Sequence, residues 1–193
     1  MRSSRALGCS CVISLSLATI ACAEPPDKEI RAAQTALELA RAAGADEYAH
    51  DGFRAAEDAL RHARDAVADR DYRLALNNAL DSRERADDAA REAATNKARA
   101  QADANRDLTK ASAALSGLKA QLSAAAGRAP ARLLADAQSR ADAEASLVQE
   151  ARTALGRADY RAALKALDGS AARLTALRRD LEEAIAPPPR KRR

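Results

Sequence analysis

The residues of this 193-residue chain that could do thiol chemistry all lie near its start: Cys9, Cys11 and Cys22. The positively charged Arg2 and Arg5 precede them, and an apolar run extends from about residue 11 to residue 21. This order is that of an export signal, and the run is shorter than the roughly 20 apolar residues that a membrane span needs. We therefore expect residues 1–22 or 1–23 to be a signal peptide. The chain after it has no cysteine, so disulfides and thiol catalysis are excluded there.

Two processing reactions fit the end of this leader. The tripeptide ACA at 21–23 has small residues at the positions that a general signal peptidase reads, and cleavage there would leave Glu24 first. The tetrapeptide TIAC at 19–22 instead resembles the lipobox of bacterial lipoproteins, whose cysteine thiol takes a diacylglycerol. Thr19 departs from that motif, which prefers Leu at this position. We expect lipidation of Cys22, with ordinary cleavage as the alternative.

The positive charge of the chain lies mainly at its ends. The formal net charge is +4. The leader arginines contribute +2 and a C-terminal tail after three prolines contributes +4, so the rest of the chain carries about −2. The tail cations are Arg190, Lys191, Arg192 and Arg193. The remaining body is close to neutral, whereas nucleic-acid binding needs a basic face on the fold. A short cationic tail can instead contact an anionic lipid headgroup or envelope polymer.

The titratable residues of the body form no catalytic or metal-binding constellation. His50 and His62 are twelve residues apart on one predicted helix, about 18 Å, so they cannot share a metal and are expected at the surface. Most carboxylates have arginine neighbours at helical spacing, which is typical of a solvated face. Tyr72 and Tyr160 each stand in Asp-Tyr-Arg and should pack across a helical turn. We expect a protein that is not an enzyme and that holds no metal or cofactor.

Long helices must position these residues. The body is rich in Ala, Arg, Asp, Glu and Leu and has no Trp, a composition typical of helical bundles and coiled coils. Proline is absent from 27–129 and from 131–186, so the breaks fall at glycines and at aspartates that can cap a helix. The predicted helices span 27–43, 46–69, 71–126, 130–156 and 159–185. The third would be about 80 Å long.

An internal repeat predicts how these helices are organised. ARDAVADRDYRLAL at 63–76 matches ARTALGRADYRAAL at 151–164 with eight identities in fourteen positions and an offset of 88. NALD at 78–81 then matches KALD at 165–168 with an offset of 87. We predict an all-α fold of two elongated antiparallel bundles, built from two copies of one hairpin and joined by a long central helix. The bundles would span 27–95 and 96–186, with 187–193 as the tail.

Apolar positions at alternating spacings of four and three predict the packing seams. The second helix has Ala49, Phe53, Ala56, Leu60, Ala63 and Val67. Its counterpart has Ala137, Ala141, Glu144, Val148, Ala151 and Leu155, so Glu144 interrupts the seam. Further seams are Leu108, Ala111, Leu115, Leu118, Leu122 and Ala125, and Leu167, Ala171, Leu174, Leu181 and Ile185. Residues 87–107 contain no apolar side chain larger than Ala and are predicted to be a solvated waist. Alanine buries little area, so the cores should be thin and lack a ligand-sized cavity.

These features resemble an uncharacterised family of Ala-rich helical domains in Gram-negative envelope lipoproteins. The resemblance rests on the leader with Cys22, on AGADEYA at 43–49 and on the Asp-Tyr-Arg hairpin after it, and it covers most of 27–95 and, more faintly, 128–185. In that family an OmpA-like peptidoglycan-binding domain often follows. Here PPPRKRR follows the helices, so that domain is not carried over.

The resemblance implies a location and a fold. We expect a periplasmic protein, lipid-anchored to the outer membrane, because Ala23 is not the Asp that favours inner-membrane retention. The predicted function is a non-enzymatic spacer or protein-interaction module with an unidentified envelope protein as partner. The alternative is binding of an anionic envelope polymer or lipid headgroups through Arg190 to Arg193. The membrane itself would be a partner through the lipid, and nucleic acid would not.

Overall fold

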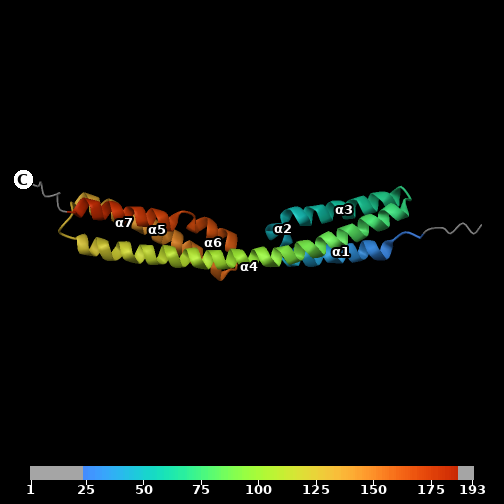
Figure 1. Cartoon of the computed structure of the whole chain (residues 1–193), viewed down its shortest axis with the longest axis horizontal. Helices are drawn as coiled ribbons and strands as arrows, with labels where there is room; N and C mark the ends of the chain where they lie inside the picture. The colour runs from blue at the N-terminus through green and yellow to red at the C-terminus, as the bar shows by residue number, and fades with distance from the viewer. Residues whose placement is uncertain (1–23, 187–193) are drawn as a thin grey trace, which may run out of the picture.

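A computed structural model describes residues 24–186, and all regular secondary structure in this range is α-helical. The predicted all-α class is therefore confirmed. The described helices are α1 (Asp27–Ala42), α2 (Ala45–Tyr48), α3 (His50–Ala68), α4 (Tyr72–Ala125), α5 (Ala131–Gly156), α6 (Tyr160–Leu167) and α7 (Ser170–Ile185). The shorter helices pack along α4, which runs through the whole rod (Figure 1).

The central helix α4 has 54 residues and is therefore about 80 Å long. Its start is fixed by Asp71, whose carboxylate accepts a hydrogen bond from the backbone N–H of Leu74 at 2.9 Å. Its end precedes Gly127, which has a φ of 77° that suits glycine far better than other residues. The sequence predicted this helix to within one residue at each end.

Two groups of helices cover the two halves of α4. The first half carries α1, α2 and α3, and the second half carries α5, α6 and α7 (Figure 1). The first group shares one core cluster around Phe53, Leu60 and Tyr48. The second group forms two clusters, one around Val148 and Leu167 and the other around Leu118, Leu174 and Leu181. Most other buried residues are alanines, so the cores are thin.

The turns α3–α4 and α5–α6 have the same backbone geometry. In the first, Arg70 has a φ of 61° and donates its N–H to the carbonyl of Val67 at 3.0 Å, while Asp71 N–H donates to Ala66 at 2.9 Å. These two bonds define a Schellman motif. The second turn repeats them 88 residues later, from Ala158 (φ 58°) to Leu155 at 3.0 Å and from Asp159 to Ala154 at 2.9 Å.

Buried positions in the two halves also share the offset of 88. From Ala49 onward, ten pairs are buried in both halves. They are 49 and 137, 53 and 141, 60 and 148, 63 and 151, 66 and 154, 75 and 163, 79 and 167, 82 and 170, 86 and 174, and 93 and 181. Two copies of one hairpin would give this common register. Besides Glu144, six of the predicted seam positions are only half-buried: Val67, Leu108, Leu115, Leu155, Ala171 and Ile185. Ala66 is buried beside Val67.

The predicted single helix 46–69 is wrong because the chain breaks at Ala49, which separates α2 from α3. Ala49 has φ −143° and ψ 44°. The break leaves the carbonyl of Tyr48 free, and the side-chain amide of Asn96 on α4 donates to it at 2.8 Å. Alanine is the best helix former, so no local signal marks this position. A contact 48 residues away supports the break instead.

The predicted single helix 159–185 is also wrong. It divides into α6 and α7 at Gly169, which has a φ of 66°. The guanidinium of Arg173 donates to the freed carbonyl of Asp168 at 2.8 Å. A single glycine within a helix costs only about 1 kcal/mol relative to alanine, so Gly169 alone did not identify the break.

The stretch 87–107 is less solvated than predicted. Ala89, Ala93 and Ala104 are buried, whereas Ala94 and Ala98 are exposed. The expectation was wrong for the three buried alanines because the bundles extend towards each other and cover one side of α4 (Figure 1). We call residues 94–103 the waist.

Candidate functional site

The predicted lipidation residue Cys22 and the predicted contact residues Arg190 to Arg193 lie outside the described residues. The structure does describe the residues that follow the leader and those that precede the tail. Pro25 and Pro26 share a groove with Leu76 of the second turn of α4. Ile185 packs on the cluster that contains Ala125, the last residue of α4. The described ends, residues 24 and 186, therefore lie at opposite ends of the rod (Figure 1).

Glu144, which interrupts the predicted seam of α5, is held by two groups from α7. The hydroxyl of Ser170, which is fully buried, donates to Oε2 of Glu144 at 2.5 Å. Nε of Arg173 donates to Oε1 at 2.5 Å, and Nη2 donates to Oε2 at 3.2 Å. The Glu144 side chain is only 12% exposed, whereas that of Arg173 is 50% exposed. We call these three residues the Glu144 cluster.

The electrostatics of the Glu144 cluster favour a carboxylate that is charged at neutral pH. Burial raises the pKa of Glu144, but the hydrogen bonds from Arg173 and Ser170 outweigh burial, so the pKa lies below its ordinary value. A general acid at neutral pH needs the opposite shift. The arrangement is therefore suited to holding α5 against α7. The sequence located Glu144 but missed its partners, although Ser170 follows Ser82, also buried, by 88 residues.

A groove beside this cluster has a volume of about 340 Å³ and opens to solvent. Arg140, Glu144 and Asp180 line it together with the apolar Leu177. The groove bounded by Ala113 and Ala172 between α4 and α7 is larger and likewise open. These grooves lie between helices and not inside a core.

A second group of polar contacts crosses the waist. The guanidinium carbon of Arg161 lies 5.5 Å from the ring centre of Tyr48, and its Nε lies 3.8 Å from Oε1 of Glu47. Tyr160 packs against the core cluster of the first bundle. Tyr160 was predicted only to pack across its own helical turn, so its contact with the other bundle was missed.

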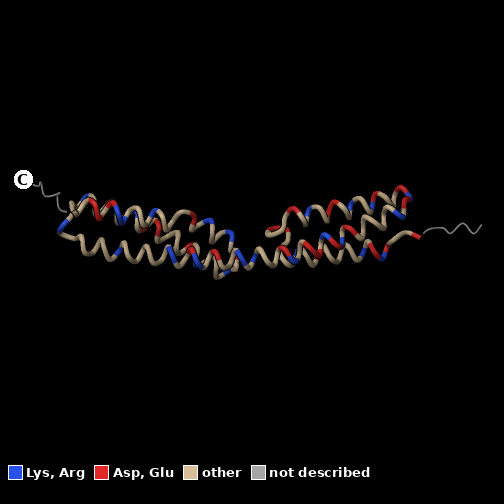
Figure 2. Tube along the Cα trace, in the orientation of Figure 1, with Lys and Arg blue, Asp and Glu red and all other residues tan. Residues whose placement is uncertain are grey.

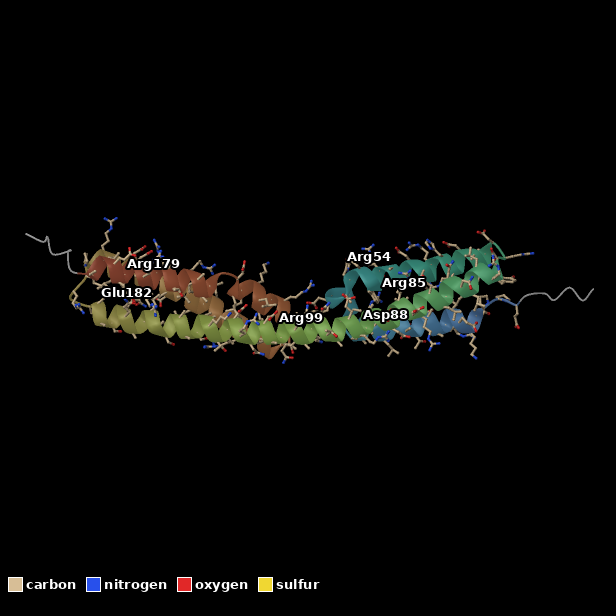
Figure 3. The ribbon with its side chains drawn as sticks, viewed as in Figure 1. Arg54, Arg85, Asp88, Arg99, Arg179 and Glu182 are labelled. Carbon is tan, nitrogen blue, oxygen red and sulfur yellow. The ribbon has the colours of Figure 1, made fainter. Side chains whose placement is uncertain are left out.

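The surface carries closely mixed charges. Lys and Arg alternate with Asp and Glu along the first bundle (Figure 2), and the charged side chains labelled in Figure 3 are all exposed. Exposed pairs such as Arg85 with Asp81 at 2.8 Å are screened by solvent and contribute little to stability. Residues 111–125 of α4 differ, because Lys119 is their one charged residue.

His50 and His62 are both exposed, as predicted. A ring nitrogen of His50 lies 3.2 Å from the backbone carbonyl of Asp46. Within residues 24–186, no group of three or more His, Cys, Asp or Glu side chains could hold a metal ion. None of the described helices combines the length and apolarity needed to cross a membrane.

Comparisons with known proteins add no relative to these observations. No protein-family model, no curated protein and no solved structure matches the chain.

Proposed function

We propose that the protein is a non-enzymatic helical spacer of the Gram-negative cell envelope. One observation carries this proposal: the described chain enters at one end of a rod built on α4 and leaves at the other. A 54-residue helix separates these ends by about 80 Å. The mixed surface charges and thin cores of residues 24–186 support a structural role, because the grooves between their helices open to solvent and would not shield a reaction from water.

The two predicted contact sites complete the spacer. A lipid on Cys22, two residues before Glu24, would hold the α1 end of the rod at the periplasmic face of the outer membrane. In this proposal Arg190 to Arg193, which follow α7 and three prolines in the sequence, would lie at the far end. There the cations would contact an acidic polymer of the envelope, with up to about 1 kcal/mol for each cation. A partner protein bound along the helices remains compatible with the same arrangement.

Site-specific crosslinking in cells tests the proposal. A photoreactive residue would replace Lys28 near the start of α1 or Glu183 near the end of α7; both are exposed. The spacer predicts crosslinks from position 28 to outer-membrane components and from position 183 to the cell wall or to proteins bound to it. The same envelope layer at both positions would contradict it.

Two further variants separate the ends. Cys22→Ser should abolish incorporation of labelled palmitate and release the protein from the membrane. Deletion of Arg190 to Arg193 in that background should lower sedimentation with purified envelope fractions at low salt, and added salt should have the same effect on the intact tail. Unchanged sedimentation after the deletion would rule out the tail and leave the helix faces as the contact.

A further inference from the structure

The turn between α5 and α6 brings a tyrosine and an arginine to the middle of the rod. The chain of α5 returns from the far end of α4 towards the waist, so Tyr160 and Arg161 start α6 opposite α2 (Figure 1). The same Asp-Tyr-Arg at 71–73 starts α4 at the outer end of the rod. Two equal local structures therefore face different surroundings.

Side chains of this turn contact the first bundle. Tyr160 packs on its core cluster, and Arg161 lies over the ring of Tyr48 with a centroid distance of 5.5 Å. Such a distance is within the range of a cation–π interaction. Arg161 also pairs with Glu47 at 3.8 Å. One arginine thus contacts two neighbouring residues of α2.

The receiving side is itself fixed in place. The break at Ala49 ends α2 beside α4, and Asn96 of α4 donates to the carbonyl of Tyr48 at 2.8 Å. Tyr48 is 8% exposed. Burial and then the negative charge of Glu47 raise the pKa of the Tyr48 phenol, while Arg161 lowers it in part. Tyr48 is therefore a neutral, oriented ring at neutral pH.

Within residues 24–186, the ion pair and the cation–π contact of Arg161 are the only ones of their kind that join α1–α3 to α5–α7. Among the described helices, no Cα of α1, α2 or α3 lies within 8 Å of a Cα of α5, α6 or α7. The contact depends on long side chains and not on backbone packing. We propose that Tyr160 and Arg161 form a latch on Glu47 and Tyr48 that holds the two bundles in one fixed orientation along α4. The latch goes beyond the spacer function, since it acts on the rod wherever the protein is located.

Distances between spin labels on the two bundles test the latch. The full chain with Cys9, Cys11 and Cys22 changed to Ser would carry single cysteines at Arg54 on α3 and Lys165 on α6, which are both exposed. The intact latch should give one narrow distance distribution. Tyr160→Ala with Arg161→Ala should broaden it by about twofold or more, because collective bending of the waist is then opposed only by α4.

The matched control is Tyr72→Ala with Arg73→Ala, which removes the same side chains from the equivalent turn at the outer end. It should leave the distribution narrow.

Arg161→Glu tests the latch with an exposed side chain (62% exposed) and should broaden the distribution by repelling Glu47. Adding Glu47→Arg should narrow the distribution again. Circular dichroism melting verifies that each variant is folded. A broad distribution for the intact latch, or a distribution that stays narrow in both Tyr160→Ala with Arg161→Ala and Arg161→Glu, would overturn the proposal.

Discussion

The two bundles bury matching positions but fill them with different side chains. In the first bundle the large residue is Phe53 on α3, and Ala86 lies in the same core cluster on α4. In the second bundle the counterpart of Phe53 is Ala141, and the counterpart of Ala86 is Leu174. The larger side chain of this pair of positions therefore lies on α3 in the first bundle and on α7 in the second. Cores tolerate such exchanges when total volume and pattern are kept, so the register of small and large residues specifies this fold more than the residue at any one position.

The buried serines show a second difference between the bundles. Ser82 donates to the backbone carbonyl of Ala56 at 2.8 Å. Ser170, its counterpart, donates to the side chain of Glu144, which replaces Ala56. The first bundle satisfies its hydroxyl with backbone alone, whereas the second requires an ion pair with Arg173. Polar contacts in the second bundle are therefore more vulnerable to single substitutions.

The largest expected effect comes from Phe53. Phe53→Ala should lower the free energy of unfolding by about 3–5 kcal/mol because it leaves a cavity beside alanines. Adding Ala86→Leu copies the arrangement of the second bundle and should recover part of this loss. Urea denaturation of the single and double variants measures both. If Ala86→Leu destabilises Phe53→Ala further, volume has not been exchanged between these two positions.

Removing the carboxylate of the Glu144 cluster should have the next largest effect. Glu144→Ala leaves the buried hydroxyl of Ser170 and one side of Arg173 without a partner, at a cost of about 1–3 kcal/mol. The control is Glu150→Ala on the exposed side of α5, which should stay within about 0.5 kcal/mol. Equal losses would show that the cluster contributes nothing specific.

The same cluster should make stability depend on pH. The folded-state pKa of Glu144 lies below its ordinary value of 4.5, so the unfolded chain takes up this proton first as the pH falls. The stabilisation is fully present above pH 4.5 and is lost below it, as the pH falls through the folded pKa. As the pH falls below 5, the Glu144→Gln variant should therefore lose less of its free energy of unfolding than the original chain. Denaturant titrations of both proteins at each pH measure this difference. Equal losses in the two proteins would contradict the assignment.

The two Schellman turns offer a smaller, stabilising test. Arg70 and Ala158 occupy left-handed conformations, which cost about 1–2 kcal/mol for a residue with a Cβ. Arg70→Gly and Ala158→Gly should each raise the free energy of unfolding by about 0.5–1 kcal/mol. This gain is smaller than the strain that is relieved, because glycine loses more conformational entropy on folding. Melting temperatures of the two variants compare the turns directly. A gain at only one position would show that the turns differ despite their shared hydrogen bonds.

The sequence predicted what local chemistry controls. Asp71 as a cap and Gly127 as a terminator define α4, and seam spacing predicted the burial of Phe53 and Leu118. It failed where a distant side chain decides the backbone. The break at Ala49 depends on Asn96, and the contact of Arg161 with Tyr48 depends on which end of the rod each turn reaches. For neither the break nor this contact does the sequence within one helical turn of the residue contain a signal.

The smallest expected effect is at the waist. Ala94 is exposed between the two bundles, and Lys has nearly the helix propensity of Ala, so Ala94→Lys should change the free energy of unfolding by less than about 0.5 kcal/mol. Its neighbour Ala93 is fully buried and is the counterpart of Leu181. Ala93→Leu should cost about 1–3 kcal/mol, because extra methylene groups at a fully buried position overpack the core. Urea denaturation of both variants would show whether the covered side of α4 extends to residue 93 and stops there. A loss at Ala94 as large as that at Ala93 would mean that a further surface covers the waist.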